Sequence, residues 1–580
     1  MKLRSTALAL TVLLGCRSSN TPAVQNPTTG DGTTSPQNTA QNTPPPRVDP
    51  PTPGPARDVH LPPVRRTQLA NGLEVNTVEY HTLPVLHVRL IVRAGASTDP
   101  QNLPGLAAFT GDMLKEGTRT KTSAQIAEAI EFVGGSIDVS TGPDFTSIAV
   151  SVLKDHAETA FTLLGEVLTQ PSFPAVEIDK LRRRELDRLH RAQRDPAWLG
   201  RRTFYSALYG ANHPYGRYDT TPEALGRINR NEIVNYHRAR YVAGNMTLTV
   251  VGDVQPANLD ALLGRTLGQV RRGTAPAPTF PAMPELAARQ IYLVNRPDSA
   301  QSVIRIGNPS LRRRDEDYVP FSVVNQSLGG GASSRLFMDL RELRSLTYGA
   351  YANTTDNVEV GAWVSAGSVR TPATGDALHA FLRHIECAAT EAAPDAEMAQ
   401  TRSYLIDSFP LSIETPGNIA DLVASLRSYG LPDDYYDQYR TRVAQVDGTG
   451  ALAIAQRYIH PDKAIIVVVG TADAPVQVGP PCQEASRLPA DASFAQQLQA
   501  CAGRAVNTEN PAPRQTMALQ EVLRTFGPVR VLRMDGTLER ELTATPPQSP
   551  PIHARCDELT APALQRISHS EAPQRAATAP

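Results

Sequence analysis

The feature that most constrains the fold of this chain is an internal repeat. Two apolar, β-rich runs each end at a glycine, Gly252 and Gly470, and an Arg-Tyr pair, at 240–241 and at 457–458, precedes each glycine by about 11 to 12 residues. Equivalent positions therefore lie about 217 residues apart. Self-similarity at a fixed period predicts two copies of one structural unit.

The same order of strands and helices recurs in the two copies. Runs rich in β-branched and aromatic residues predict strands at 73–80, 85–92, 136–140, 146–153 and 246–251, and again at 291–294, 302–306, 358–366 and 464–469. Helical periodicity is found at 106–115, 122–133, 157–168, 175–193, 231–241, 318–328 and 334–344. Strands and helices in runs predict an α+β fold of two homologous halves, 64–270 and 271–474.

Proline separates these halves from the two ends of the chain. Residues 17–63 hold 12 prolines and residues 475–580 hold 14, whereas the 411 residues between them hold 23. The first segment is poor in large apolar side chains, which predicts a disordered tether. The last segment is predicted to be a partly disordered extension with a hairpin over 526–538, turning at Asp535-Gly536.

The N-terminus has the pattern of a bacterial lipoprotein signal peptide, residues 1–16. Lys2 and Arg4 precede a short apolar run, and the small residue Gly15 precedes Cys16, which resembles a lipobox. We predict that Cys16 is lipidated and holds the chain in the cell envelope, at the periplasmic face of a membrane. The alternative is an ordinary secretory signal with an incidental cysteine. No other run reaches the ~18 apolar residues of a transmembrane helix.

Four further cysteines, Cys387, Cys482, Cys501 and Cys556, would lie in an oxidising compartment. Cys482 and Cys501 are close enough in sequence to close a small loop. The pairing cannot be deduced from the sequence, so it stays open.

The overall charge argues against one class of partner. The chain has 57 Lys and Arg against 58 Asp and Glu, a formal net charge of −1. A balanced chain lacks the basic footprint of nucleic-acid binding, so no nucleic-acid partner is predicted.

Several motifs in 64–474 together resemble the insulinase/pitrilysin family of zinc peptidases, the inverzincins, which includes the processing peptidases. The motifs are Gly105-Leu106-Ala107, Met113-Leu114, Gly117-Thr118, Asn212-His213-Pro214-Tyr215-Gly216, Thr221-Pro222-Glu223, Asn245-Met246, Val251-Gly252-Asp253, Leu328-Gly329-Gly330, Ser333-Ser334-Arg335-Leu336, Arg341-Glu342 and Leu346-Thr347-Tyr348. The resemblance implies that each half is a duplicated α/β layer unit and that the two halves enclose a chamber.

The family's zinc motif is degenerate in this chain. The resemblance implies H-x-x-E-H on a helix, where two histidines at i and i+4 share zinc and the glutamate is the base for the bound water. The sequence has Ala108, Gly111 and Asp112 at these three places. A later helix offers Glu185 and Asp187 near the place of the third ligand. We predict that this chain binds no metal.

The second half keeps the other part of the family's active site. The resemblance implies that an arginine and a tyrosine seven residues later reach the substrate, and Arg341 and Tyr348 have this spacing. A guanidinium and a phenol can both hold a peptide carbonyl as negative charge develops on it. The alternative is that Arg341 pairs on a helix surface and Tyr348 is ordinary filling.

A degenerate zinc motif together with a retained Arg/Tyr pair implies that this chain is the non-catalytic subunit of a heteromeric zinc endopeptidase. Such a subunit binds the substrate and activates the peptidase but is inactive alone. Its partners would be a paralogous subunit with intact H-x-x-E-H that carries the zinc, a peptide or protein substrate, and a membrane reached through Cys16. The second hypothesis is a peptide-binding pseudoenzyme or envelope scaffold without proteolysis. The third is a lone peptidase with Asp112 and Asp187 as unusual ligands, which lacks a base in the motif.

Overall fold

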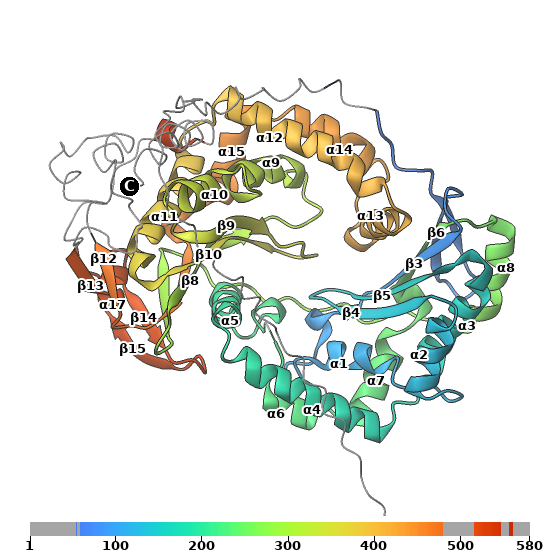
Figure 1. Cartoon of the computed structure of the whole chain (residues 1–580). Coiled ribbons are helices and arrows are strands. Elements are labelled where there is room, and N and C mark those ends of the chain that lie inside the picture. The colour runs from blue at the N-terminus through green and yellow to red at the C-terminus, as the bar shows by residue number, and fades with distance from the viewer. Residues whose placement is uncertain (1–53, 55–57, 218, 479–514, 547–555, 561–580) are drawn as a thin grey trace, which may run out of the picture. The chain divides into compact units, whose positions relative to one another are not determined.

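Two mixed β-sheets, one in each half of the chain, organise the structure (Figure 1). The structure is a computed structural model, which describes residue 54 and residues 58–217, 219–478, 515–546 and 556–560. Apart from Gly54, these residues belong to one compact unit, residues 56–580. The predicted signal peptide, Cys16, most of the predicted tether, Cys482 and Cys501 lie outside the described residues.

The first sheet has six strands in the order β1-β2-β6-β3-β5-β4. They are β1 (Arg65–Gln68), β2 (Glu74–Glu79), β3 (Val85–Val92), β4 (Ser136–Thr141), β5 (Thr146–Leu153) and β6 (Met246–Gly252). β2 and β6 are parallel, and the other neighbours are antiparallel. The five strands predicted for the first half are thus all present.

The second sheet repeats the order of five of these strands, β2-β6-β3-β5-β4, and has β14 and β15 at the edge where the first sheet has β1, giving β15-β14-β7-β11-β8-β10-β9. They are β7 (Gln290–Asn295), β8 (Gln301–Ser310), β9 (Thr347–Thr354), β10 (Gly361–Arg370), β11 (Ile465–Gly470), β14 (Val529–Leu532) and β15 (Leu538–Leu542). Here β7 and β11 are the parallel pair of the repeat, as β2 and β6 are in the first sheet. The matching order and directions confirm the predicted α+β fold of two homologous halves.

Helices pack around both sheets. In the first half they are α1 (Leu106–Met113), α2 (Ser123–Glu131), α3 (Ala157–Thr169), α4 (Ala175–Ala192), α5 (Pro196–Tyr209), α6 (Pro222–Arg227), α7 (Arg230–Arg240) and α8 (Pro256–Thr266). Later in the chain they are α9 (Tyr318–Gly329), α10 (Arg335–Phe337), α11 (Thr374–Thr390), α12 (Asp395–Ser408), α13 (Pro416–Tyr429), α14 (Tyr435–Ala444), α15 (Gly448–Tyr458) and α17 (Leu519–Arg524).

The two halves exchange one helix each. α5 of the first half packs against β11 and β8 of the second sheet, and α13 of the second half packs against β6 and β3 of the first sheet (Figure 1). β6 and β11 are buried along their whole length because helices cover both of their faces. In β11, Val467 and Val469 pack in one core with α5, whereas Ile466 and Val468 point into the other.

Glycines at equivalent repeat positions mark the two crossing points. A Cβ on Gly200 of α5 would lie 3.3 Å from the Arg305 side chain of β8. A Cβ on Gly417 of α13 would lie 3.5 Å from the ring of His87 on β3. The absence of a side chain lets each helix approach the sheet of the other half closely.

Some predicted elements have other boundaries or another form. The helix predicted at 334–344 is a short α10 followed by a π-helical turn, Met338–Leu343, and the strand predicted at 358–366 is β10, which begins at Gly361. The sequence analysis predicted neither α5 nor β9. Both have mixed patterns, because α5 contacts two environments and β9 is an edge strand with one exposed face.

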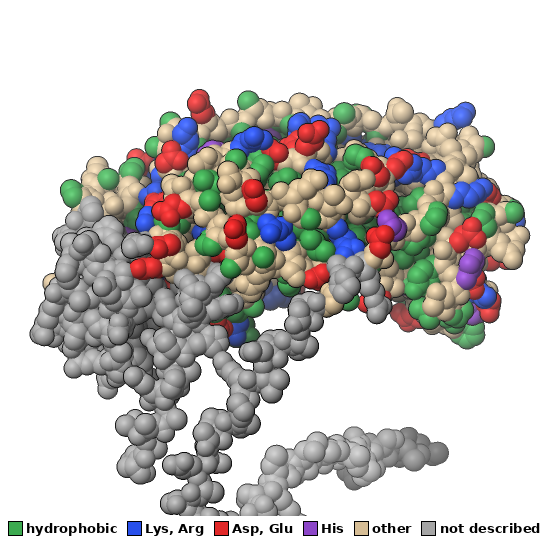
Figure 2. All heavy atoms as spheres, turned by 90° about the horizontal axis from the view of Figure 1, so that it is seen from above, with side chains coloured by type: hydrophobic (Ala, Val, Ile, Leu, Met, Phe, Trp, Pro, Cys, Tyr) green, Lys and Arg blue, Asp and Glu red, His purple; other side chains and the backbone are tan. Residues whose placement is uncertain are grey.

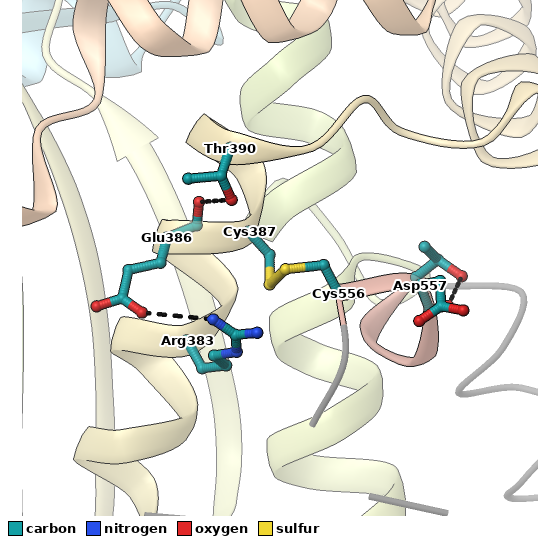
Figure 3. The surroundings of a disulfide bond; sticks show 7 residues. Arg383, Glu386, Cys387, Thr390, Cys556 and Asp557 are labelled. Atoms are coloured by element: carbon teal, nitrogen blue, oxygen red, sulfur yellow. Dashed lines mark hydrogen bonds and ion pairs between the residues drawn. A yellow bond between two sulfur atoms is a disulfide. The ribbon is translucent and has the colours of Figure 1, made fainter. Parts of the chain in front are cut away.

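The C-terminal extension joins the second half. The predicted hairpin is confirmed as β14 and β15, and β14 pairs in parallel with β7. A second, two-stranded sheet pairs β12 (Pro475–Val478) with β13 (Gln515–Ala518). A disulfide joins Cys387 of α11 to Cys556, which settles the one pairing within the described residues (Figure 3). In the described part of the chain, no helix is long and apolar enough to span a bilayer.

The helix exchange predicts a large cost for truncating a side chain of α5. Phe204 is 0% exposed and its ring packs against Gly307 of β8, so Phe204→Ala leaves a cavity between the halves. We expect the free energy of unfolding to fall by about 3–5 kcal/mol, measured by denaturant titration. Phe132→Ala is the matched control, because that ring is 89% exposed and its loss costs roughly 0.5 kcal/mol or less. Equal losses in the two variants would contradict the role of α5.

Candidate functional site

A cavity of about 840 Å³ lies beside α1, and residues of both halves line it. The first half contributes side chains from α1, α4 and α5 and from the segment 214–220. The second half contributes 355–357, the loop that follows β9. Asp144 joins the two walls, since it accepts a hydrogen bond from Tyr215 Oη at 2.7 Å and another from the backbone N–H of Val358 at 2.9 Å.

α1 presents two positions of the degenerate motif to this cavity. The helix begins after Gly105, where the Asp99 carboxylate accepts hydrogen bonds from the backbone N–H groups of Gly105 and Ala107 at 2.6 and 2.7 Å. Ala108 and Asp112, four residues apart, therefore lie on one face of the helix and line the cavity. Neither supplies an imidazole.

The third motif position is closed as well as changed. Gly111 is buried against β4, and a Cβ there would lie 2.8 Å from Thr141 Oγ1 and 3.4 Å from Val139. Thr141 is itself fixed by a 2.9 Å hydrogen bond with Thr146. A side chain at position 111 would displace the Thr141 hydroxyl, and glycine itself has no group that could act as the family's general base.

Of the two acids offered by α4, only one faces the cavity. Glu185 lines it together with Ala108 and Asp112. Asp187, two residues further along the helix, is exposed and does not line it. Burial, together with the charge of Glu185, raises the pKa of Asp112 to about 6. Asp112 and Glu185 are therefore the carboxylates that lie where the family resemblance implies a zinc ion.

An arginine neutralises part of this acidic group. Arg188, one turn beyond Glu185 on α4, donates from Nε to Glu185 at 2.7 Å. Its two Nη atoms donate to the two oxygens of Asp219 at 3.0 and 2.8 Å. Trp198 Nε1 of α5 donates to Asp219 at 3.0 Å, so α4, α5 and the loop after Gly216 are joined at this point. A guanidinium fork thus balances the carboxylates beside α1.

These groups do not fit zinc. Two carboxylates without an imidazole do not make a tetrahedral zinc site, and Glu185 is already paired with Arg188. Within the residues that the structure describes, no three His, Cys, Asp or Glu side chains are grouped as a metal site requires. The prediction that the chain binds no metal still needs a direct measurement.

Arg341 and Tyr348 lie together, away from the cavity lining. The Arg341 guanidinium carbon is 4.7 Å from the ring centroid of Tyr348 and 4.7 Å from that of Phe337. Tyr348, at the start of edge strand β9, is 86% exposed. The structure therefore brings the two predicted residues into contact but does not place them beside Asp112.

A buried ion group holds the segment that carries Arg341. Asp339, in the π-helical turn, accepts from Arg344 Nε at 2.7 Å and lies 2.9 Å from His384 Nε2 of α11. Asp339 and His384 are fully buried, and the charge of Arg344 together with the hydrogen bond to His384 holds the pKa of Asp339 below its ordinary value despite that burial. The exposed Arg341–Tyr348 pair thus stands on a fixed base.

The sequence analysis missed several lining residues. Pro214 and Tyr215, from the family motif at 212–216, line the cavity. Arg188, Trp198 and Asp219 were not expected there. The sequence signals that could have predicted α5 lie at its two ends. Asp195 caps the helix, Pro196 is its first residue, and a glycine follows its last turn.

Two known protein families together match most of the two halves of the chain. Residues 75–213 match the family described as Insulinase (Peptidase family M16). Residues 227–405 match the family described as Peptidase M16 inactive domain. The two matches include the degenerate motif in the first half and the Arg341–Tyr348 pair in the second.

Individual relatives span more than one bacterial group. An uncharacterized zinc protease of Mycobacterium leprae is 29% identical over 291 residues, 50% of this chain and 65% of that protein, just under two thirds of its length. An uncharacterized zinc protease of Mycobacterium tuberculosis is 28% identical over 373 residues, 63% of this chain and 84% of that protein. The non-peptidase homolog YmxG of Helicobacter pylori is 24% identical over 363 residues, 61% of this chain and 82% of that protein.

Solved structures are similar in fold. The peptidase M16 inactive domain from Pseudomonas fluorescens has a TM-score of 0.67 and 26% identity, and the match covers 70% of this chain and 98% of that one. A protease from Helicobacter pylori has a TM-score of 0.66 and 18% identity, covers 71% of this chain and 100% of that one, and shows the fold alone.

The raised pKa of Asp112 predicts a pH-dependent gain on substitution. The folded chain holds this proton more tightly than the unfolded chain, so ionisation of Asp112 costs stability as the pH rises from about 4 to about 6. We expect Asp112→Asn to be more stable than the wild type by about 1–3 kcal/mol at pH 7.5, with the difference vanishing below pH ~4. Denaturant titrations across this range measure it. Asp138→Asn, an exposed acid on β4, should show no such change; a gain at Asp112 that is independent of pH would contradict the assignment.

Proposed function

We propose that this chain, which belongs to the insulinase family of peptidases (peptidase family M16), is a non-catalytic subunit of a heteromeric zinc endopeptidase in the bacterial envelope. Its role there is to bind the peptide substrate and to activate a paralogous subunit that carries H-x-x-E-H and the zinc. The observation that carries the proposal is the exposed Arg341–Tyr348 pair, which lies outside this chain's own cavity.

The cavity beside α1 supports the non-catalytic part of the proposal. Hydrolysis of a peptide bond at a zinc site needs a metal with an open position and a base for the bound water. Ala108 supplies no ligand, Asp112 and Glu185 are two carboxylates of which Glu185 is paired with Arg188, and Gly111 has no side chain that could act as a base. The family relative from Helicobacter pylori is named a non-peptidase homolog, and we propose the same of this chain.

The exposed pair supports the activating part. An arginine stacked on a largely exposed tyrosine offers a charged fork and a phenol O–H to a group outside this chain. Both groups are donors that can hold a carbonyl oxygen as it gains negative charge. The buried Asp339–Arg344 pair fixes the turn beneath them, so the two donors are held in place before substrate arrives.

The envelope location rests on two features. The N-terminal pattern ending at Cys16 is that of a lipoprotein signal, and the Cys387–Cys556 disulfide is a bond typical of oxidising compartments.

Removing either donor should slow the complex but leave it assembled. We expect Arg341→Ala and Tyr348→Phe each to lower kcat/KM for peptide cleavage by the reconstituted pair at least roughly tenfold, since loss of one oxyanion donor costs about 10²–10³ in rate in other enzymes. The assay mixes this chain with its H-x-x-E-H paralogue and follows a quenched fluorescent peptide.

The matched control is Tyr404→Phe, an exposed tyrosine on α12. Unchanged cleavage by the Arg341 and Tyr348 variants would contradict the activating role and favour a peptide-binding scaffold. Elemental analysis of the chain purified alone tests the other half of the proposal: about one zinc per chain, with activity lost on chelation, would overturn it.

Lipidation at Cys16 predicts that this residue decides membrane attachment. In cells that lack the paralogue, Cys16→Ala should leave the protein at precursor size or release it into the soluble fraction. Stable anchoring requires more than one acyl chain at ~0.8 kcal/mol per buried CH₂, and the bare tether provides none. Cell fractionation and immunoblotting measure this, with Ser18→Ala as the control. Undiminished attachment of the Cys16 variant would refute the anchor.

A further inference from the structure

A second cavity, of about 1050 Å³, lies next to the first. It is formed by the end of α4, by α5, by the segment 216–223 and by the β14–β15 turn at Met534 and Asp535. Trp198, Arg217 and Asp219 line both cavities. A peptide bound beside α1 can therefore continue into the second cavity.

The second cavity is rich in arginine. Four guanidinium groups line it, those of Arg191, Arg194, Arg202 and Arg217. None of them forms an ion pair with a carboxylate in the described part of the chain, although Arg202 donates to the Asp535 carbonyl oxygen at 2.9 Å. The space thus contains positive charge that the fold leaves unbalanced.

The carboxylates that line this cavity are fewer than its guanidinium groups, and two of them already accept hydrogen bonds from other groups. Asp219 accepts hydrogen bonds from both Nη atoms of Arg188 and from Trp198 Nε1. Arg188 itself does not line this cavity. The Oδ1 atom of Asp535 accepts from the backbone N–H and the hydroxyl of Thr537. Glu223 is the third acid of the lining. On the face seen in Figure 2, basic and acidic side chains are interspersed.

Arg217 is the clearest sign of a missing ligand. Its Nη1 atom is buried and has no hydrogen-bond partner among the described atoms. A buried guanidinium N–H without an acceptor costs free energy, and a carboxylate is the acceptor that fits its planar fork. Arg217 also lies where the two cavities meet, since it lines both.

We propose that the second cavity is a subsite for a carboxylate of the bound peptide, with Arg217 as its principal donor. The carboxylate is that of an acidic side chain or of the peptide's C-terminus, because these are the anions that a peptide carries. This inference rests on the proposed peptide-binding function and adds a substrate class to it: peptides with a negative charge to one side of the segment bound beside α1.

The test is the binding of fluorescein-labelled decapeptides to the full-length chain, followed by anisotropy. Three peptides of one sequence are compared: an amidated peptide with a glutamine near its C-terminus, the same peptide with glutamate, and the glutamine peptide with a free C-terminal carboxylate. We expect at least one carboxylate peptide to bind roughly tenfold more tightly than the neutral one, and the preference to shrink at 1 M NaCl. Which carboxylate is preferred identifies the source of the charge.

Variants distinguish binding at the subsite from general electrostatic attraction between the peptide and the chain. Arg217→Gln should abolish the preference for the carboxylate peptides, and Arg194→Gln, at an exposed position, should weaken the preference without endangering the fold. Arg183→Gln is the control, because Arg183 is exposed on α4 and lines neither cavity.

Two results would overturn the inference in different ways. Equal binding of all three peptides, or a preference that survives in both Arg217→Gln and Arg194→Gln, overturns the subsite and leaves the proposed peptide binding standing. Binding of none of the peptides overturns the proposed peptide binding itself, and the subsite with it.

Discussion

The structure depends on the exchange of α5 and α13 between the two halves. β6 and β11 are buried on both faces, and the helices of a strand's own half cover only one of these faces. The other half supplies the second cover, so neither sheet is complete without the partner half. α5 also carries Trp198 and Arg202, and the helix that joins the halves is therefore also a wall of both cavities. Stability and ligand binding share one element.

Sequence reasoning succeeded where one local pattern decides the structure. β-rich runs ending in glycine identified β6 and β11, and their spacing identified the duplication. It failed where two environments meet in one element. α5 mixes Leu199 and Phe204, buried against the other half, with Arg201 and Tyr205, which line the first cavity, so its periodicity is blurred. The pairing of Cys387 with Cys556 depends on tertiary contact over 169 residues and leaves no local trace.

The candidate site shows the same division. The places of Ala108 and Asp112 followed from helix geometry, because residues four apart share a face. The salt bridge from Arg188 to Asp219 could not follow from it, since the two residues are 31 apart and meet only when α4 packs beside the loop after Gly216. Arg188 balances carboxylates of this site with a guanidinium that the chain carries itself.

The two sheets differ in how their outer edge is covered, and this difference sets an order of events in the cell. β2 pairs with β1, which immediately precedes it, whereas β7 pairs with β14, where Tyr292 and Arg530 are 238 residues apart. A chain synthesised from its N-terminus completes the first sheet edge early. The edge of β7 stays open until the last part of the chain emerges, and an open strand edge is a site for wrong pairing with other chains. A product truncated before β14 would keep that edge exposed permanently, which gives the quality-control proteases of the cell a physical feature by which to recognise it.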